Sequence, residues 1–370
     1  MKLFTSRLTA FRALAVASTI CFCFGAALAQ TPQPKVIILA TGGTIAGSSG
    51  TTTDTKYEAG VLDVDSLIAA VPAMKDIAIV EGERISNVGS QDMSATIWYN
   101  LAARISEAYD DPSISGVVIT HGTDTIEETA FFLDLVFPSG KPIVLTGSMR
   151  PADSISADGP KNLEDAVRVA ATSASAGRGV LVVLNQEIHS ARGIIKAHTE
   201  NVDAFVSEHG GMAGEIINGK PHYLEASARA IVAPNIDNWL QISDRTLPKI
   251  GIIYGHVDSD PILVRFFGRN SYDGIVLAGV GNGNTNKRTI QELSKVVDRM
   301  VVVRSSRVRG GFVSRNVELD DDDLGFVAAE DLSPQKARIL LQLLLAKETP
   351  KSEIQALFRC NTPLNLEYCN

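Results

Sequence analysis

Two threonine-rich segments carry the residue types that chemistry would need. Residues 40–47 read Ala-Thr-Gly-Gly-Thr-Ile-Ala-Gly and follow an apolar run at residues 35–39. Residues 120–130 begin Thr-His-Gly-Thr-Asp-Thr and follow a similar run at residues 116–119. Each segment places hydroxyl groups and glycines where a buried strand is predicted to end, and ligands bind at this edge of an open parallel sheet. The two segments together predict a nucleophile and a second polar group that face one substrate.

Thr44 in the first segment is the leading candidate for the nucleophile. A hydroxyl is a weak nucleophile at neutral pH and needs a base or a polarising partner, while Gly42 and Gly43 let the main chain approach a substrate and point amides at a developing oxyanion. A phosphate-binding loop is a weaker interpretation, because the segment lacks the lysine of a P-loop and the spacing of a dinucleotide fingerprint. Threonine also suits a helix N-cap, so this segment alone leaves nucleophile and cap evenly matched.

Thr123 and Asp124 in the second segment add a charged group. Asp124 could bind a substrate ammonium group or orient Thr123, although Thr123 or Thr125 could equally cap the helix that is predicted to follow. Lys196 follows two apolar residues. Partial burial makes a lysine amine easier to deprotonate, so Lys196 is a possible base, although this pattern alone favours a surface position.

Apolar runs rich in valine and isoleucine alternate with amphipathic stretches along the chain. The runs predict strands covered on both faces, at residues 36–40, 117–120, 143–146, 180–184, 250–254, 275–278 and 301–303. Helical spacing of apolar residues occurs at Ile97, Leu101 and Ile105, and again at Leu163, Ala166, Val167 and Ala170. The alternation predicts an α/β fold with right-handed crossovers.

A mixed segment at residues 224–247 interrupts this alternation. We therefore predict a larger N-terminal domain at residues 30–223, with a parallel-rich sheet flanked by helices. A linker at residues 224–247 and a smaller C-terminal α/β domain at residues 248–370 follow.

The first 29 residues are typical of a secretory signal peptide. Three basic residues precede an apolar stretch at residues 13–27, and Ala27-Leu28-Ala29 fits a small-x-small cleavage site before Gln30. A membrane anchor is the alternative, but the apolar stretch is short for a spanning helix. Export predicts a periplasmic protein in a Gram-negative source and an extracellular one otherwise, with no membrane segment after cleavage.

Charge and cysteine content narrow the function classes. The net charge is −8, and removal of residues 1–29 leaves −11; with no long Lys/Arg run, nothing suggests a nucleic-acid partner. Export permits disulfides, so Cys360 and Cys369 could pair or stay free thiols. No Cys/His spacing resembles a metal site, and we expect no metal.

The chain resembles the bacterial-type L-asparaginases, specifically the exported type II branch that includes periplasmic asparaginases and glutaminase-asparaginases. The likeness covers essentially all of the mature chain. It rests on the two threonine segments in this order, on Lys196, and on further blocks at residues 89–93, 148–151, 156–160, 279–284 and 304–307.

The resemblance implies an amidohydrolase that uses a threonine acyl-enzyme and no cofactor. Thr44 resembles the primary nucleophile, which attacks the side-chain amide, and Tyr57 matches a tyrosine in the mobile loop that closes over the site. Thr123, Asp124 and Lys196 match a second cluster in which the lysine and the aspartate tune the threonine hydroxyl.

Substrate-binding roles and an assembly are implied as well. Ser90, Gln91 and Asp124 match residues that hold the α-carboxylate and α-amino groups of the substrate. Asn284 and Glu318 match C-terminal residues that reach the site of a neighbouring subunit. The family is generally a homotetramer built from two intimate dimers, so a monomer is expected to lack a complete site.

The implied reaction converts L-asparagine and water to L-aspartate and ammonia, with glutamine as a weaker or comparable substrate. Gln91 stands where several dual-specificity relatives have glutamate, which favours asparagine, although one position does not settle a one-methylene discrimination worth about 1–3 kcal/mol. Two alternatives stay open. An exported amino-acid-binding protein would need no hydroxyl–lysine cluster, and a glutaminase subunit that feeds ammonia to a cytosolic partner would need no signal peptide.

Overall fold

The structure is a computed structural model of the 370-residue chain. It describes residues 32–50, 58–137, 140–224 and 246–360. The predicted signal peptide, Tyr57, Cys369 and nearly all of the predicted linker at 224–247 lie outside the described residues.

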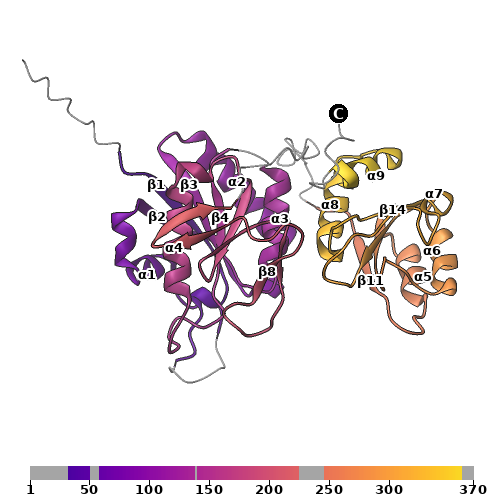
Figure 1. Cartoon of the computed structure of the whole chain (residues 1–370), viewed down its shortest axis with the longest axis horizontal. Coiled ribbons are helices and arrows are strands. Elements are labelled where there is room, and N and C mark those ends of the chain that lie inside the picture. Colours follow the sequence, from indigo (N-terminus) through magenta and orange to yellow (C-terminus); the bar gives the residue numbers. More distant parts are fainter. Residues whose placement is uncertain (1–31, 51–57, 138–139, 225–245, 361–370) are drawn as a thin grey trace, which may run out of the picture. The chain divides into compact units, whose positions relative to one another are not determined.

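An eight-stranded sheet forms the N-terminal part of the fold. Its strands, in spatial order, are β10 (Lys220–Tyr223), β9 (Gly214–Ile217), β6 (Glu187–Ser190), β5 (Val180–Leu184), β4 (Ile143–Thr146), β3 (Ile114–Thr120), β1 (Lys35–Gly42) and β2 (Ile79–Val88). The five strands from β5 to β2 are parallel, and the other three add antiparallel pairs. Figure 1 shows this sheet with helices packed around it.

Helices cover both faces of this sheet, which explains the continuous apolar character of its strands. They are α1 (Val64–Ala69), α2 (Ala95–Asp110), α3 (Ile126–Val136) and α4 (Gly159–Ala171). Alternate residues of β1 enter different cores: Ile37 and Leu39 pack with α2 and α3, while Val36 and Ile38 pack with α1 and α4. The period of two along a strand sends neighbouring side chains to opposite faces.

A smaller four-stranded parallel sheet follows in the C-terminal part. Its strands, in spatial order, are β11 (Ile250–Tyr254), β12 (Gly274–Gly279), β13 (Val301–Ser306) and β14 (Phe326–Ala328). Its helices are α5 (Ile262–Arg269), α6 (Lys287–Ser294), α7 (Asp321–Leu324), α8 (Pro334–Ala346) and α9 (Lys351–Cys360). Helix α8 packs against β11, β12 and β13 and also against α3.

Short elements complete the described chain. A two-stranded antiparallel sheet joins β7 (Ile194–Lys196) to β8 (Phe205–Ser207), and four 3₁₀ turns occur at η1 (Thr44–Ala46), η2 (Pro72–Asp76), η3 (Ser90–Asp92) and η4 (Ser173–Ser175).

The predicted fold class is confirmed: a larger N-terminal parallel-rich α/β sheet precedes a smaller C-terminal α/β sheet. All seven predicted strands are present, and Leu101, Ile105 and the apolar stripe of α4 are buried. The sequence patterns did not reveal β2, the antiparallel strands or β14.

Candidate active site

The two threonine segments lie at neighbouring strand ends. Strands β1 and β3 pair in parallel, with Ala40 opposite Thr120, so their carboxyl ends share one edge of the sheet. Thr44 begins the 3₁₀ turn after β1, and Thr123 lies between β3 and α3. Both threonines are buried, at 7% and 5% exposure.

Glycines allow the loops at this edge to touch through their main chains. Gly43 has φ 83°, and a Cβ atom built there would lie 2.4 Å from the nitrogen of Gly122. A Cβ atom on Gly122 would lie 2.7 Å from Ser90 Oγ. A side chain at either position would force the loops apart, so glycine at these positions brings three loops onto one site.

Lys196 joins this edge from β7 and contacts both members of the second segment. Its Nζ donates to Thr123 Oγ1 at 2.9 Å and to Asp124 Oδ1 at 2.6 Å. The Lys196 side chain is 17% exposed, against 63% for Asp124. The surface position that the local pattern favoured for Lys196 is therefore wrong. Because Thr123 Oγ1 accepts from the amine, its own hydrogen points elsewhere.

The structure places neither Thr44 nor Thr123 at a helix N-cap. Gly43, not Thr44, stands at the N-cap of η1. Thr125 occupies the N-cap position of α3 but makes no capping bond; its hydroxyl donates to the carbonyl of Ser90 at 2.7 Å. Ser90 Oγ accepts from the main-chain N–H of Asp124 at 3.2 Å. The threonine–aspartate segment is therefore tied to the Ser90 turn.

A buried group of polar side chains holds the main chain at Lys196. Glu127 accepts from the Lys196 N–H at 2.9 Å and from Gln335 Nε2 at 2.6 Å. Lys336, next in α8, donates to the carbonyls of Arg192 and Ile194 at 2.7 and 2.6 Å. Burial lowers the pKa of Lys336 to about 8. The first turn of α8 therefore holds the strand that presents the candidate catalytic lysine.

A second buried chain of hydrogen bonds fixes the loop before Thr123. Trp98 Nε1, which can only donate, bonds Thr129 Oγ1 at 2.8 Å, and this hydroxyl lies 2.8 Å from His121 Nε2. The carbonyl of Gly122, 2.7 Å from Nδ1, can only accept, so the His121 proton lies on Nδ1 and Thr129 donates to Nε2. Burial lowers the pKa of His121 to about 4. One neutral tautomer is thus fixed beside the site.

The edge opens into a cavity of about 990 Å³. Of the predicted site residues, its walls include Thr44, Ser90, Gln91, Thr123, Asp124 and Lys196. Hydroxyls thus face the cavity alongside an amine and a carboxylate that pair with one another. This combination suits nucleophilic attack and the binding of a zwitterion.

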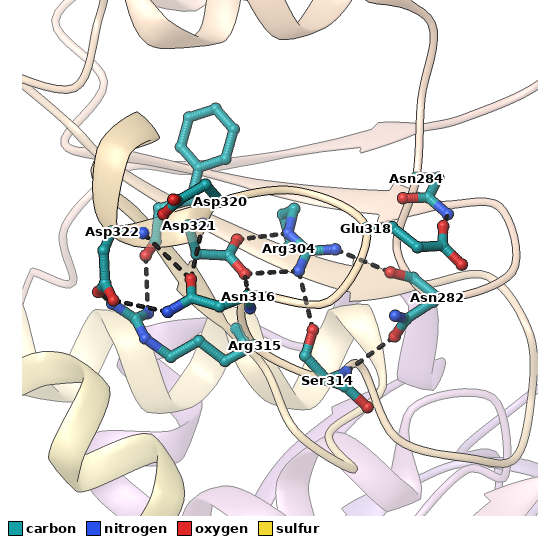
Figure 2. A network of polar contacts seen from close by, with 12 residues as sticks. Asn282, Asn284, Arg304, Ser314, Arg315, Asn316, Glu318, Asp320, Asp321 and Asp322 are labelled. Atoms are coloured by element: carbon teal, nitrogen blue, oxygen red, sulfur yellow. Dashed lines mark hydrogen bonds and ion pairs between the residues drawn. The ribbon is translucent and has the colours of Figure 1, made fainter.

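Three predicted residues are not part of these walls. Tyr57 lies outside the described residues. Asn284 and Glu318 are hydrogen-bonded to one another in the C-terminal part, as Figure 2 shows, and the described chain does not place them in the cavity wall.

The described residues contain no cluster of three or more His, Cys, Asp or Glu side chains that could hold a metal ion. Within the same ranges, no helix has the length and apolar character that crossing a membrane requires. Cys360 is disulfide-bonded, which excludes a free thiol at this position.

Residues that support the site were missed from the sequence. Glu127, Lys336 and Trp98 act through contacts between distant segments, the Gln335–Glu127 bond spanning 208 positions. His121 stands in the threonine segment, but nothing in its spacing reveals its partner Thr129. No local pattern could have identified these pairs.

Comparisons with known proteins match almost the whole described chain. The family model "Asparaginase, N-terminal" matches residues 35–229, and "Glutaminase/Asparaginase C-terminal domain" matches residues 249–358. The chain is 44% identical to L-asparaginase 2 of Escherichia coli, over 94% of this chain and 98% of that protein. It is 47% identical to a probable periplasmic L-asparaginase of Haemophilus influenzae, over 91% and 96%. The crystal structure of a probable cytoplasmic L-asparaginase from Campylobacter jejuni matches with a TM-score of 0.81 and 41% identity, covering 88% of this chain and 99% of that one.

Proposed function

The chain belongs to the asparaginase family, and on this premise we propose that it is an exported amidohydrolase that converts L-asparagine and water to L-aspartate and ammonia. The observation that carries this proposal is the contact of Lys196 Nζ with both Thr123 Oγ1 and Asp124 Oδ1, in a cavity that Thr44 also lines. A protein that only binds asparagine would not need the amine of Lys196 hydrogen-bonded to the hydroxyl of Thr123.

Thr44 is the proposed nucleophile. Its Oγ adds to the side-chain carbonyl carbon of asparagine, the carbon–nitrogen bond breaks, and the hydroxyl proton ends on the leaving nitrogen, which departs as ammonia. Water then attacks the resulting ester, aspartate leaves, and a proton returns to Thr44. Tyr57 is proposed to assist Thr44.

The second cluster is proposed to handle water and protons. Lys196 donates to Thr123 Oγ1, so the Thr123 hydrogen can point to the leaving nitrogen or to the attacking water. Asp124 keeps the charge of the lysine balanced. No metal or cofactor takes part in this route.

The amino-acid end of the substrate needs an anion for its ammonium and donors for its carboxylate. Asp124 supplies the anion, since its side chain is 63% exposed and lines the cavity. Ser90 Oγ accepts from Asp124 N, so its own hydrogen can go to the carboxylate. Gln91 lines the same wall, and we propose that it favours asparagine over glutamine.

The site is proposed to be shared between subunits of a homotetramer. Asn284 and Glu318 contact one another outside the cavity wall. The adjoining Val317, Phe312 and Val308 are 66%, 36% and 53% exposed. Exposed apolar side chains next to polar side chains that do not line the cavity of their own chain suit contact with a second copy.

Export to the periplasm is proposed from residues 1–29. One relative is named periplasmic and the structural neighbour is named cytoplasmic, so the relatives do not decide the compartment. A mature protein that begins at Gln30 in the periplasmic fraction would support export. Retention in the cytoplasm with residues 1–29 intact would oppose it.

Ammonia release by the purified protein, with L-asparagine and L-glutamine side by side, tests the activity. Release from asparagine and little from glutamine is the expected result, and similar rates would remove the role given to Gln91. No release, with asparagine retained intact, would support the binding-protein interpretation.

Two variants of one residue test the nucleophile. Thr44→Val keeps the shape and loses the hydroxyl, and it should abolish turnover. Thr44→Ser keeps the hydroxyl and should retain measurable activity. Substantial turnover by Thr44→Val in a well-folded oligomer would remove Thr44 from its role.

Mixed oligomers test the shared site. Thr44→Ala and Glu318→Ala chains should each be inactive alone and recover activity together, because one subunit type then supplies Thr44 and the other Glu318. No recovery in mixed oligomers of proven composition would refute sharing.

A further inference from the structure

Asn284 and Glu318 are presented by two separate loops. Asn284 lies in the loop after β12, at residues 280–286, and Glu318 lies in the loop between β13 and α7, at residues 307–320. A side chain on a loop is placed only as accurately as the contacts that hold the loop. The contacts that hold these two loops converge on one buried cation.

That cation is Arg304 of β13, which has no exposed surface and pairs with the equally buried Asp321. Nε and Nη2 donate to the two Asp321 oxygens at 2.6 and 2.7 Å. Nη1 donates to the carbonyl of Asn282 at 2.8 Å, and Nη2 also donates to the carbonyl of Ser314 at 3.1 Å. Figure 2 shows the guanidinium between the two loops. One planar group thus holds both loops and the start of α7.

Asn282 and Asn316 complete the network of hydrogen bonds around Arg304 that connects the two loops. We call this network the link. Asn282 Oδ1 accepts from the N–H of Ser314 at 2.8 Å and joins the loops directly. The Asn316 N–H donates to Asp321 at 3.0 Å, and Asn316 Oδ1 accepts from the Asp321 N–H at 2.8 Å. Each asparagine stands two residues before the polar side chain that its loop presents. The link therefore fixes the two loops close to those side chains.

A buried ion pair is weak evidence for stability, since apolar residues of similar volume often serve as well. The burial of Arg304 and Asp321 is better explained by the two loops that their hydrogen bonds hold in place. We propose that Arg304, with Asp321 and Asn282, is a positioning residue for Asn284 and Glu318, although the guanidinium never touches substrate. This inference rests on the proposed function, in which Asn284 and Glu318 complete the substrate site of a neighbouring subunit.

Two variants test the link. Removal of Arg304 alone leaves a buried carboxylate unpaired, so one variant combines Arg304→Met with Asp321→Leu. The other, Asn282→Ala, removes only the bond between the loops. Asn270→Ala is the matched control, because it likewise removes one hydrogen bond between an asparagine side chain and the main chain in the C-terminal part.

Steady-state kinetics and L-aspartate binding give the readout. Asn282→Ala should raise KM for asparagine and the Kd for aspartate about tenfold, with kcat less affected, which is the size expected for coupled neighbours. Asn270→Ala should change neither. Because Glu318→Ala is expected to be inactive, its comparison uses aspartate binding: addition of Asn282→Ala to Glu318→Ala should raise the Kd little beyond that of Glu318→Ala alone. An unchanged KM for Asn282→Ala, or a tenfold rise in Kd on adding Asn282→Ala to Glu318→Ala, would overturn the inference.

Mixed oligomers show on which subunit the link acts. Asn282→Ala placed on the Thr44→Ala chain should raise the KM of the recovered activity about tenfold, since that chain supplies the intact Glu318. Placed on the Glu318→Ala chain, it should have no effect. Equal loss in both arrangements would indicate a general structural defect and contradict the positioning role. If the parent pair fails to recover, sharing of the site fails, while aspartate binding by the variant that combines Asn282→Ala with Glu318→Ala still decides the inference. A wild-type chain that neither hydrolyses asparagine nor binds aspartate refutes the proposed function instead.

Discussion

Acidification should destabilise this protein through His121. The ring is completely buried, and burial lowers its pKa from the usual 6.5 to about 4. The folded state therefore favours the neutral ring, and below pH 6.5 the unfolded chain binds the extra proton. Stability from this group is complete above pH 6.5 and declines as the pH falls to about 4. At 1.36 kcal/mol per pKa unit, the loss is about 3 kcal/mol.

The hydrogen bonds explain why the folded state resists protonation. Thr129 Oγ1 already accepts from Trp98 Nε1 and gives its own hydrogen to His121 Nε2. A proton on Nε2 would face that hydrogen, so the hydroxyl would have to turn away from the ring. The His121 ring, which bonds the Gly122 carbonyl, would then lose the contact with Thr129 that fixes its orientation.

Urea unfolding at pH 7.0, 5.5 and 4.5 measures the effect, at one protein concentration because the chain is proposed to be an oligomer. His121→Gln is the control, since it cannot titrate in this range. The wild type should lose about 2–3 kcal/mol more than the variant between pH 7.0 and 4.5. Parallel losses in both proteins, or titration of His121 near pH 6.5 in the folded protein by NMR, would refute the reasoning.

Three other substitutions follow from the contacts of the site. Gly43→Ala should remove activity and lower the unfolding temperature, because the new Cβ atom would meet the nitrogen of Gly122 at 2.4 Å; ammonia release and thermal unfolding measure both. Lys336→Met should lower kcat by tenfold or more, on the order of 1.4 kcal/mol, by loosening the strand that carries Lys196, and steady-state kinetics of a variant with native far-UV circular dichroism checks this. Since the folded state favours the neutral amine of Lys336, wild-type stability should also rise between about pH 8 and 10.5, and the variant should lose that rise in urea unfolding. Asp153→Asn should raise KM, because the Asp153 carboxylate accepts hydrogen bonds from residues 48–50, which follow the Thr44 turn; a KM equal to that of the wild type would contradict this.

The strands that carry the site could be predicted because their sequence signal is local. Each buried parallel strand is a short apolar run, and the threonines stand where the β1 and β3 runs end. Strands with one exposed face gave no such signal: β2 mixes Glu81, Glu83 and Arg84 with apolar residues, and β10 contains Pro221 and His222. Their place in the sheet depends on neighbours that are far away in sequence.

The site residues also differ in how well the sequence predicts them, because some depend on partners far away in the chain. Thr44 and Thr123 could be selected from their own segments, but Lys196 looked like a surface residue because its partners lie 72 and 73 positions away. The resemblance to a family supplied that assignment. Nothing in the chain around Arg304 shows that its guanidinium is fully buried, since this follows from how two loops close over β13.

Three buried polar side chains, those of His121, Lys336 and Arg304, share one feature: each lies next to a segment that carries a residue proposed to act on substrate. Each is almost completely buried, and each bonds main-chain carbonyls close to a residue that is proposed to act on substrate. Burial of a polar or charged group costs free energy, and the lowered pKa values of His121 and Lys336 show that the folded state disfavours their charged forms. A function in stability alone is therefore a poor explanation for them, while a function in placing loops explains both their burial and their acceptors. Stability and activity should then separate at these positions. Apolar replacements that remove a complete buried pair, such as Arg304→Met with Asp321→Leu, should leave the free energy of unfolding equal or higher while substrate binding weakens.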